Sequence, residues 1–170
     1  MSVNGSLEGG IVHIFIDGDA CPVKQEVYRV AGRHELPVTL VANTWMRVPA
    51  SPRITLEVVP DAFDAADDWI VEHVATGDIV ITADILLANR CLQNGARVLG
   101  SSGRPFTVEN IGQALATREL MADLRGAGAQ GTGPPPLTPR DRSRFLQELE
   151  QAIQANLRAR PRVGGSGESP

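Results

Sequence analysis

Aromatic, lysine and cysteine residues are all scarce in this sequence. Aromatic residues make up 4% of the 170 residues, so a hydrophobic core has to come from valine, isoleucine, leucine and alanine. Lys24 is the only lysine, and arginine therefore supplies nearly all of the positive charge. The two cysteines, Cys21 and Cys91, form no CxxC pair, which argues against a disulfide framework. A chain of this length is expected to hold one domain.

Net positive charge and long apolar runs are also lacking. The formal net charge of −4 does not fit a protein that grips nucleic acid over a broad basic face, although it leaves room for a local positive site. The apolar run at residues 11–16 is far too short for a signal peptide core or a membrane span, and no basic segment precedes it. We therefore expect a cytoplasmic protein with no membrane partner.

Short apolar runs alternate with helical segments along most of the chain. Strands are expected at residues 11–16, 36–42, 55–59, 78–82 and 97–99, and helices at 22–32, 60–77, 85–93 and 107–124. Pro22 suits the first turn of a helix, and residues 19–21 are its candidate caps. Because strands that alternate with helices imply right-handed crossovers, we predict an α/β fold. We expect this fold to be a three-layer sandwich with a mainly parallel central sheet of about five strands, plus a C-terminal helix.

The C-terminal part differs in composition. Residues 126–136 are rich in glycine and proline, which is typical of a linker or long loop. Thr138 and Pro139 then form a helix start, and an apolar stripe follows at Phe145, Leu149, Ile153 and Leu157. We expect a flexible N-terminus at 1–10, an α/β domain at 11–125, a linker at 126–136, a packed helix at 137–159 and a disordered tail at 160–170.

Aspartates follow two of the predicted strands directly. Asp17 and Asp19 come after the first strand, separated by one glycine, and Asp84 comes after the fourth. In open α/β sheets, ligands bind in the crevice beyond the carboxyl ends of the strands. Asp17 is the strongest candidate, since a charge that ends a buried strand needs a partner, whereas Asp19 and Asp84 can also be helix caps.

A second acidic group opens the helix after the third strand. Asp64, Asp67 and Asp68 are spaced i, i+3, i+4 and can share one helix face. Their alternative roles are ordinary ones, an N-cap for Asp64 and favourable first-turn charges for Asp67 and Asp68. If these acids meet the strand-end acids, their pKa values rise unless a cation compensates. Mg²⁺ or Mn²⁺ fits such an oxygen site and can activate water toward a phosphodiester, with Asp64 as a further candidate ligand.

Other polar residues are weaker candidates. Asn43 and Thr82 lie at strand ends and can orient a substrate or water, or make ordinary turn hydrogen bonds. Arg104, in the loop after the last strand, can bind a phosphate or simply face solvent. Cys21 lies beside the acid pair, but no histidine is placed to act as its base. The three histidines lack metal-ligand spacing and are interpreted as structural: His13, His34 and His73.

Several motifs together resemble one family. They are IDGDACPVK (residues 16–24), LVAN (40–43), FDAAD (63–67), GDIVITADI (77–85), TVENI (107–111), LMADLR (120–125) and LTPRDR (137–142). In this order they resemble the YaiI/YqxD family of uncharacterised bacterial proteins over about residues 11–155. That family is similar to the PIN-like nucleases, small α/β domains whose strand-end acids bind Mg²⁺ or Mn²⁺ and cleave RNA. The resemblance implies that Asp17, Asp67 and Asp84 bind metal and that Asp19 supports them.

Three functional hypotheses follow. The leading one is a metal-dependent phosphodiesterase, a PIN-like ribonuclease that hydrolyses RNA with one or two Mg²⁺ or Mn²⁺ ions. A second is a haloacid-dehalogenase-type phosphatase with Asp17 as nucleophile and Asp19 as general acid, although Lys24 comes too early to be its late lysine. The third is a binding module for RNA or protein that keeps the acidic pocket and uses the last helix's arginines, Arg140, Arg142, Arg144 and Arg158.

Overall fold

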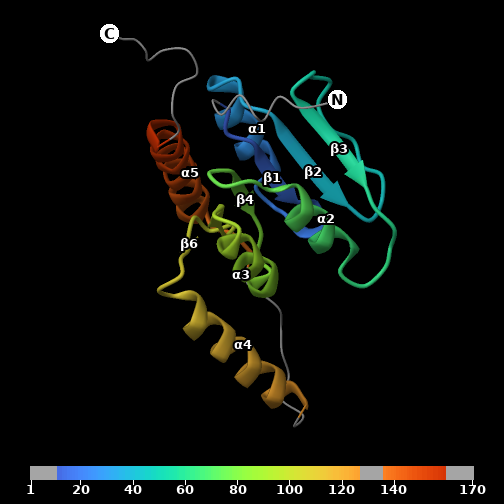
Figure 1. Cartoon of the computed structure of the whole chain (residues 1–170), viewed down its shortest axis with the longest axis vertical. Helices are drawn as coiled ribbons and strands as arrows, with labels where there is room; N and C mark the ends of the chain where they lie inside the picture. Colours follow the sequence, from blue (N-terminus) through green and yellow to red (C-terminus); the bar gives the residue numbers. More distant parts are fainter. Residues whose placement is uncertain (1–10, 127–135, 160–170) are drawn as a thin grey trace.

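The computed structural model describes residues 11–126 and 136–159 (Figure 1). These residues form β1 (Ile14–Asp17), the 3-10 turn η2 (Gly18–Ala20), α1 (Lys24–Arg33), β2 (Val38–Ala42), β3 (Ile54–Val58), α2 (Ala65–His73), β4 (Ile79–Ile81), α3 (Ile85–Gln93), β5 (Arg97–Leu99), β6 (Pro105–Phe106), α4 (Ile111–Gly126) and α5 (Pro139–Ala159). No helix in the part of the chain that is described is long and apolar enough to cross a membrane.

The strands form one sheet in the order β3-β2-β1-β4-β5-β6. All neighbouring strands are parallel except β5 and β6. The central strands are nearly all apolar, as expected when helices cover both faces of a parallel sheet. The strand order reverses between β1 and β4, because the chain builds β2 and β3 on one side of β1 and then crosses to the other. This α/β architecture confirms the predicted fold class.

One face of the sheet is covered by α1 and α5. Val27 and Val30 of α1 join Phe145 and Leu149 of α5 in a single buried cluster with β1 residues such as Ile16. The predicted apolar stripe of the last helix therefore faces the sheet. The predicted cap is also observed, since the Thr138 hydroxyl accepts the Asp141 N–H and the Asp141 carboxylate accepts the Thr138 N–H, both at 3.0 Å.

The opposite face is covered by α2 and α3. Ile70 of α2 and Leu87 and Cys91 of α3 pack against Phe15 and Val80 of the sheet. Helix α4 contacts α3 and then extends away from the sheet (Figure 1). Its second half is exposed, including the side chains of three large apolar residues: Leu120, Met121 and Leu124.

Several element boundaries differ from the sequence-based expectation. The short antiparallel strand β6 was not predicted, because two residues carry no periodic signal. Helix α1 begins at Lys24 rather than Pro22, and residues 19–21 do not cap it because η2 intervenes. Helix α2 begins late, at Ala65, because Asp64 has a left-handed backbone with φ of 62°. Helix α4 likewise begins at Ile111 instead of residue 107, after a turn.

Some expectations concern segments outside the described residues. These are the flexible N-terminus at 1–10, most of the linker at 126–136 and the tail at 160–170. The proposed domain boundaries therefore stay predictions.

Candidate functional site

The candidate site lies where the strand order reverses. Asp17 ends β1, and the residue before it, Ile16, is in register with Leu40 of β2 and Ile81 of β4. The carboxyl ends of the three central strands therefore reach the same edge of the sheet. A crevice opens at such a switch point because the two flanking connections cross opposite faces of the sheet.

A glycine makes the Asp17–Asp19 spacing possible. A Cβ atom on Gly18 would lie 2.9 Å from the Leu40 side chain and 3.1 Å from the Val41 carbonyl oxygen. Residue 18 must therefore be glycine for the chain to turn tightly against β2. The turn places two carboxylates at the end of one strand.

Thr82 joins the ends of β1 and β4. Its hydroxyl donates to Asp17 Oδ2 at 2.9 Å and accepts the backbone N–H of Asp84 at 3.0 Å. Thr82 is only 3% exposed, so this hydrogen-bonded link is shielded from water. Burial raises the pKa of Asp17; the Thr82 hydrogen bond opposes that rise, and the charges of Asp84 and Asp19 add to it.

Asp67 approaches the same edge from the first turn of α2. Burial, and after it the charges of Asp84, Asp17 and Asp64, raise its pKa from 3.8 to about 6 against the opposing effect of Arg90. Neither Asp67 oxygen accepts a hydrogen bond from any residue that the structure describes. The structure thus brings three of the predicted acids, one from each of three elements, close enough to repel one another.

Asp84 also has an ordinary structural role, and Asp64 and Asp68 are not drawn into the cluster in the same way. Asp84 Oδ1 caps α3 by accepting the N–H groups of Leu86 and Leu87, at 2.9 and 3.2 Å. Asp64 occupies the N-cap position of α2, but its exposed side chain makes no cap hydrogen bond. Asp68 forms a 2.9 Å ion pair with Arg90. The prediction of a helix cap is therefore confirmed for Asp84 and not for Asp64. Asp68 binds a basic partner and does not contribute to the site.

Asp19 connects the site to β2 and the loop before α2. Both Asp19 oxygens lie 3.1 Å from the backbone N–H of Asn43, which donates to them. The Asn43 side-chain nitrogen donates to Asp61 at 3.3 Å. Asn43 Oδ1 is the one buried side-chain polar atom among the described residues that has no hydrogen-bond partner. A bound water or ion is one explanation for a buried oxygen of this kind.

The donor chemistry at this edge fits a hard divalent cation. The available groups are all oxygens, and burial, together with their mutual repulsion, raises the pKa of Asp17 and Asp67. However, within residues 11–126 and 136–159 no three acidic, histidine or cysteine side chains are arranged to hold an ion by themselves. Mg²⁺ commonly takes only one or two carboxylates and completes its shell with waters and substrate phosphate oxygens. The residues fit that open type of site.

A groove of about 740 Å³ begins beside the acidic edge. Ala83 and Ile85, which flank Asp84, line it together with Ser101 and Arg104 of the loop after β5. Asn110 in the turn before α4, Gln113 and Thr117 of α4, and Asp141 of α5 also line it. Arg104 is exposed and has no acidic partner in the described chain, so it remains available to an anion.

Two exposed aromatic residues belong to the loops that carry Asn43 and Asp61, and they were not predicted as site residues. Trp45 is 73% exposed and Phe63 is 94% exposed. Each lies two residues from the hydrogen bond that joins Asn43 to Asp61, so both belong to the loops beside the acidic edge. Asp61 was also missed. The sequence offered only a weak signal for them: Trp45 lies between two predicted strands in a protein with few aromatics, whereas Phe63 fell inside the helix expected at residues 60–77.

The histidines and cysteines have structural roles. Burial lowers the pKa of His13 to about 4, and its ring hydrogen-bonds Thr39 at 2.8 Å. His34 hydrogen-bonds Glu150, and His73 stacks on Trp69 with ring centroids 3.7 Å apart. Burial raises the pKa of Cys21, and it raises that of Cys91 to about 12, so neither thiol is activated: both are buried and free.

The basic residues of the alternative hypotheses are partly engaged within the molecule. Arg142 binds Glu26 at 3.1 Å and the Pro22 carbonyl at 3.0 Å, and Arg144 reaches the Ser102 carbonyl at 3.4 Å. Lys24 donates to the Cys21 carbonyl at 2.8 Å. The phosphatase and binding-module hypotheses considered these three cations, and all three make contacts within the molecule.

The fold and site together define a doubly wound α/β protein with an acidic cluster at its topological switch point. The chain belongs to the YaiI/YqxD family of uncharacterised proteins, whose family model matches residues 15–155. A UPF0178 protein of Rhodospirillum rubrum is 55% identical over 150 residues, covering 88% of this chain and 100% of the relative. One of Rhodospirillum centenum is 56% identical over 154 residues, with 88% and 100% covered. One of Rhodopseudomonas palustris is 52% identical over 154 residues, with 91% and 94% covered.

Proposed function

We propose that this protein is a metal-dependent phosphodiesterase that hydrolyses RNA at the edge formed by β1 and β4. The observation that carries the proposal is the convergence of Asp17, Asp67 and Asp84, three carboxylates from separate elements, at the switch point of the sheet. A structural role does not require three acids to share a crevice, because their repulsion destabilises the protein unless a cation joins them.

The roles of the residues follow from their positions. One or two of the carboxylates of Asp17, Asp67 and Asp84 would bind Mg²⁺ or Mn²⁺ directly, and waters and substrate phosphate oxygens would complete its shell. Thr82 would keep Asp17 and Asp84 in register through its two hydrogen bonds. Asp19, anchored by the Asn43 N–H, would orient the water whose oxygen bonds to phosphorus as the P–O bond to the leaving sugar oxygen breaks. When bound, the ion supplies positive charge to the phosphate oxygens.

Two further features support RNA as the substrate. The groove that starts beside Asp84 carries Arg104, whose guanidinium can meet a phosphate outside the acidic cluster. Trp45 and Phe63, in the loops that carry Asn43 and Asp61, offer exposed aromatic faces, and unpaired bases stack on such faces. A similarity to PIN-like nucleases in the sequence motifs agrees with this arrangement.

The test combines metal binding with cleavage. Calorimetric titration with Mn²⁺ is expected to show binding by the native chain and by D68N, but not by D17N. D68N is the matched control, because Asp68 is an acid on the same helix as Asp67 that pairs with Arg90. Binding should tighten when a non-cleavable RNA analogue supplies phosphate oxygens. Binding that is equal in the native chain and D17N would contradict the proposed site.

Cleavage is measured with a labelled single-stranded RNA in Mn²⁺ and in EDTA. We expect hydrolysis only with metal, and a rate reduced by about 100-fold or more in D17N, the size expected when a group that stabilises the transition state is lost. RNA binding with a steep salt dependence and no cleavage in either metal would favour the binding-module hypothesis instead.

A further inference from the structure

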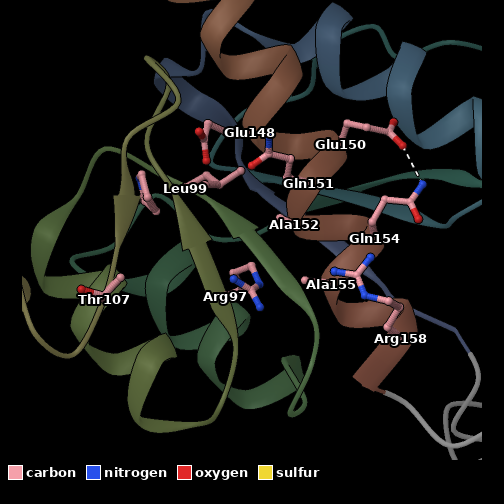
Figure 2. Close-up of a pocket in the computed structure, with 11 residues that line it drawn as sticks. Arg97, Leu99, Thr107, Glu148, Glu150, Gln151, Ala152, Gln154, Ala155 and Arg158 are labelled. Carbon is pink, nitrogen blue, oxygen red and sulfur yellow. Dashed lines mark hydrogen bonds between the residues drawn. The ribbon is translucent and has the colours of Figure 1, made fainter.

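A second groove, of about 590 Å³, lies between the β5–β6 edge of the sheet and α5 (Figure 2). Arg97, which lines it, is in register with Ile79 at the start of β4, whereas the acidic cluster follows the end of that strand. The groove therefore begins near the amino ends of the parallel strands, whereas the candidate phosphodiesterase site lies at their carboxyl ends. Its size is that of a small-molecule site.

Arg97 is held in place by a buried amide. Its Nε donates to Asn156 Oδ1 at 2.8 Å, and Asn156 Nδ2 donates to the Gly77 carbonyl at 2.6 Å. Asn156 is 5% exposed on an otherwise apolar helix face. This arrangement fixes the plane of the guanidinium while its two terminal nitrogens contact no acid among the residues of the described chain. Such a guanidinium is preorganised for an anion.

A second arginine completes the basic end of the groove. Arg158, on the last turns of α5, extends toward Arg97 with Ala155 between them (Figure 2). Arg158 likewise has no ion-pair partner in residues 11–126 and 136–159. Both guanidinium groups line the same groove, so an anion bound between them would be attracted by both positive charges.

The other end of the groove is acidic and polar. Glu148 and Glu150 line it away from the two arginines (Figure 2). Glu150 is already bound to Arg33 and His34, at 3.3 and 2.9 Å, which leaves Glu148 as the acceptor for a ligand. Between the two ends the lining is apolar or amide-bearing: Leu99, Pro105, Gln151, Ala152 and Ala155.

We propose that this groove binds a small organic phosphate monoester. The phosphate lies between Arg97 and Arg158, where two guanidinium groups can donate parallel hydrogen bonds to its oxygens. The organic body covers the apolar floor, and its hydrogen-bond donors reach Glu148. This site is independent of the proposed phosphodiesterase function, because it lies on other elements and uses no strand-end acid.

Calorimetric titration of the native chain with inorganic phosphate and with adenosine 5′-monophosphate tests the site. Both probes should bind, and the nucleotide should bind more tightly because its body fills the groove. R97Q and R158Q should each weaken binding by about tenfold or more, the loss expected for hydrogen bonds to a charged group. R158Q is the variant that preserves folding, since Arg158 makes no contact that the fold needs. R140Q on the same helix is the matched control and should bind normally.

Two-dimensional NMR locates the bound probe. Amide signals of Gln154 and Ala155 should shift during the phosphate titration, while those of Thr82 and Asp84 should not. Absence of saturable binding by the native chain, or equal weakening by R140Q and R158Q, would overturn the proposal. Shifts confined to the acidic edge would do so as well. None of these results depends on whether the chain cleaves RNA.

Discussion

At the scale of single residues, Asp67 connects the electrostatics of the acidic cluster to the stability of the protein. Its pKa is about 6 in the folded protein against an ordinary 3.8, so the folded state binds this proton more tightly than the unfolded state does. Ionised Asp67 therefore lowers the free energy of unfolding. This destabilisation is fully present above pH 6 and disappears as the pH falls toward 4. Divalent metal should remove the same penalty by binding the carboxylate.

The first prediction concerns Asp67→Asn in EDTA. At pH 8 this change should stabilise the protein by about 1 kcal/mol, since water screens a half-exposed carboxylate and reduces the full effect of the pKa rise. At pH 4 the gain should vanish. Urea unfolding at both pH values measures it. D68N serves as the control and should give no gain at pH 8, because Asp68 has Arg90 as its partner. A D67N variant that is no more stable than the native chain at pH 8 would contradict the repulsion.

The second prediction concerns the two exposed aromatics. W45A and F63A should change the free energy of unfolding by less than about 0.5 kcal/mol, as both side chains are mostly in water. Each should weaken the binding of a labelled single-stranded RNA by about tenfold, which is typical when a base loses its stacking partner. Fluorescence anisotropy in EDTA measures binding without cleavage. V108A, which removes an exposed aliphatic side chain from another region, is the control. Equal affinity in all three variants would exclude stacking at this edge.

At the scale of secondary-structure elements, the loop after β5 is fixed to α5 by close packing. Gly103 has a φ of 88°, and a Cβ atom there would lie 2.9 Å from the backbone of both Arg144 and Phe145. Phe145 is fully buried, so the helix cannot move aside without disturbing the core. The contact sets the position of the loop that carries Arg104.

The third prediction compares two glycines. G103A should destabilise the protein by about 2 kcal/mol, from the left-handed backbone and the contact with α5. G112A, in α4, meets no atom within 4 Å and should be neutral or stabilising by up to about 1 kcal/mol. Thermal or urea unfolding of both variants measures the difference. Similar stabilities for the two variants would show that the loop after β5 is not held against α5.

The sequence allowed some elements to be predicted to the residue and others not at all. Helix α3 was predicted with its observed bounds because Asp84 provides a cap and Gly95 a stop, and β5 follows directly. By contrast, Asn156 could not be recognised as a buried residue, since an amide on an apolar stripe has no sequence signal before its partners are known. The meeting of Asp17, Asp67 and Asp84 depended on the strand order, which periodicity does not determine.

At the scale of the whole molecule, the structure combines a tightly packed sheet with one exposed helix. Helix α5 buries its stripe in the core, whereas residues 116–124 of α4 are exposed and carry apolar side chains into solvent. Elements with few buried contacts open locally at a small free-energy cost. The two helices should therefore differ in stability although they are comparable in length.

The fourth prediction concerns hydrogen exchange. Backbone amides of residues 120–124 should exchange much faster than those of residues 145–153, because the former can open without exposing any core residue. Mass spectrometry of the native chain at neutral pH measures both segments in one experiment. Equal protection of the two would mean that α4 is covered in solution by a second molecule.

The sheet edges bear on how the protein behaves at high concentration. Strand β6 closes one edge with only two residues, and the first of them, Pro105, has no N–H to offer to another strand. The opposite edge strand, β3, places Glu57 among its apolar residues and lies between Pro52 and Pro60. Short strands, prolines and charged residues at sheet edges are the devices by which natural proteins avoid edge-to-edge aggregation. Both margins of this sheet thus resist the addition of strands from neighbouring chains.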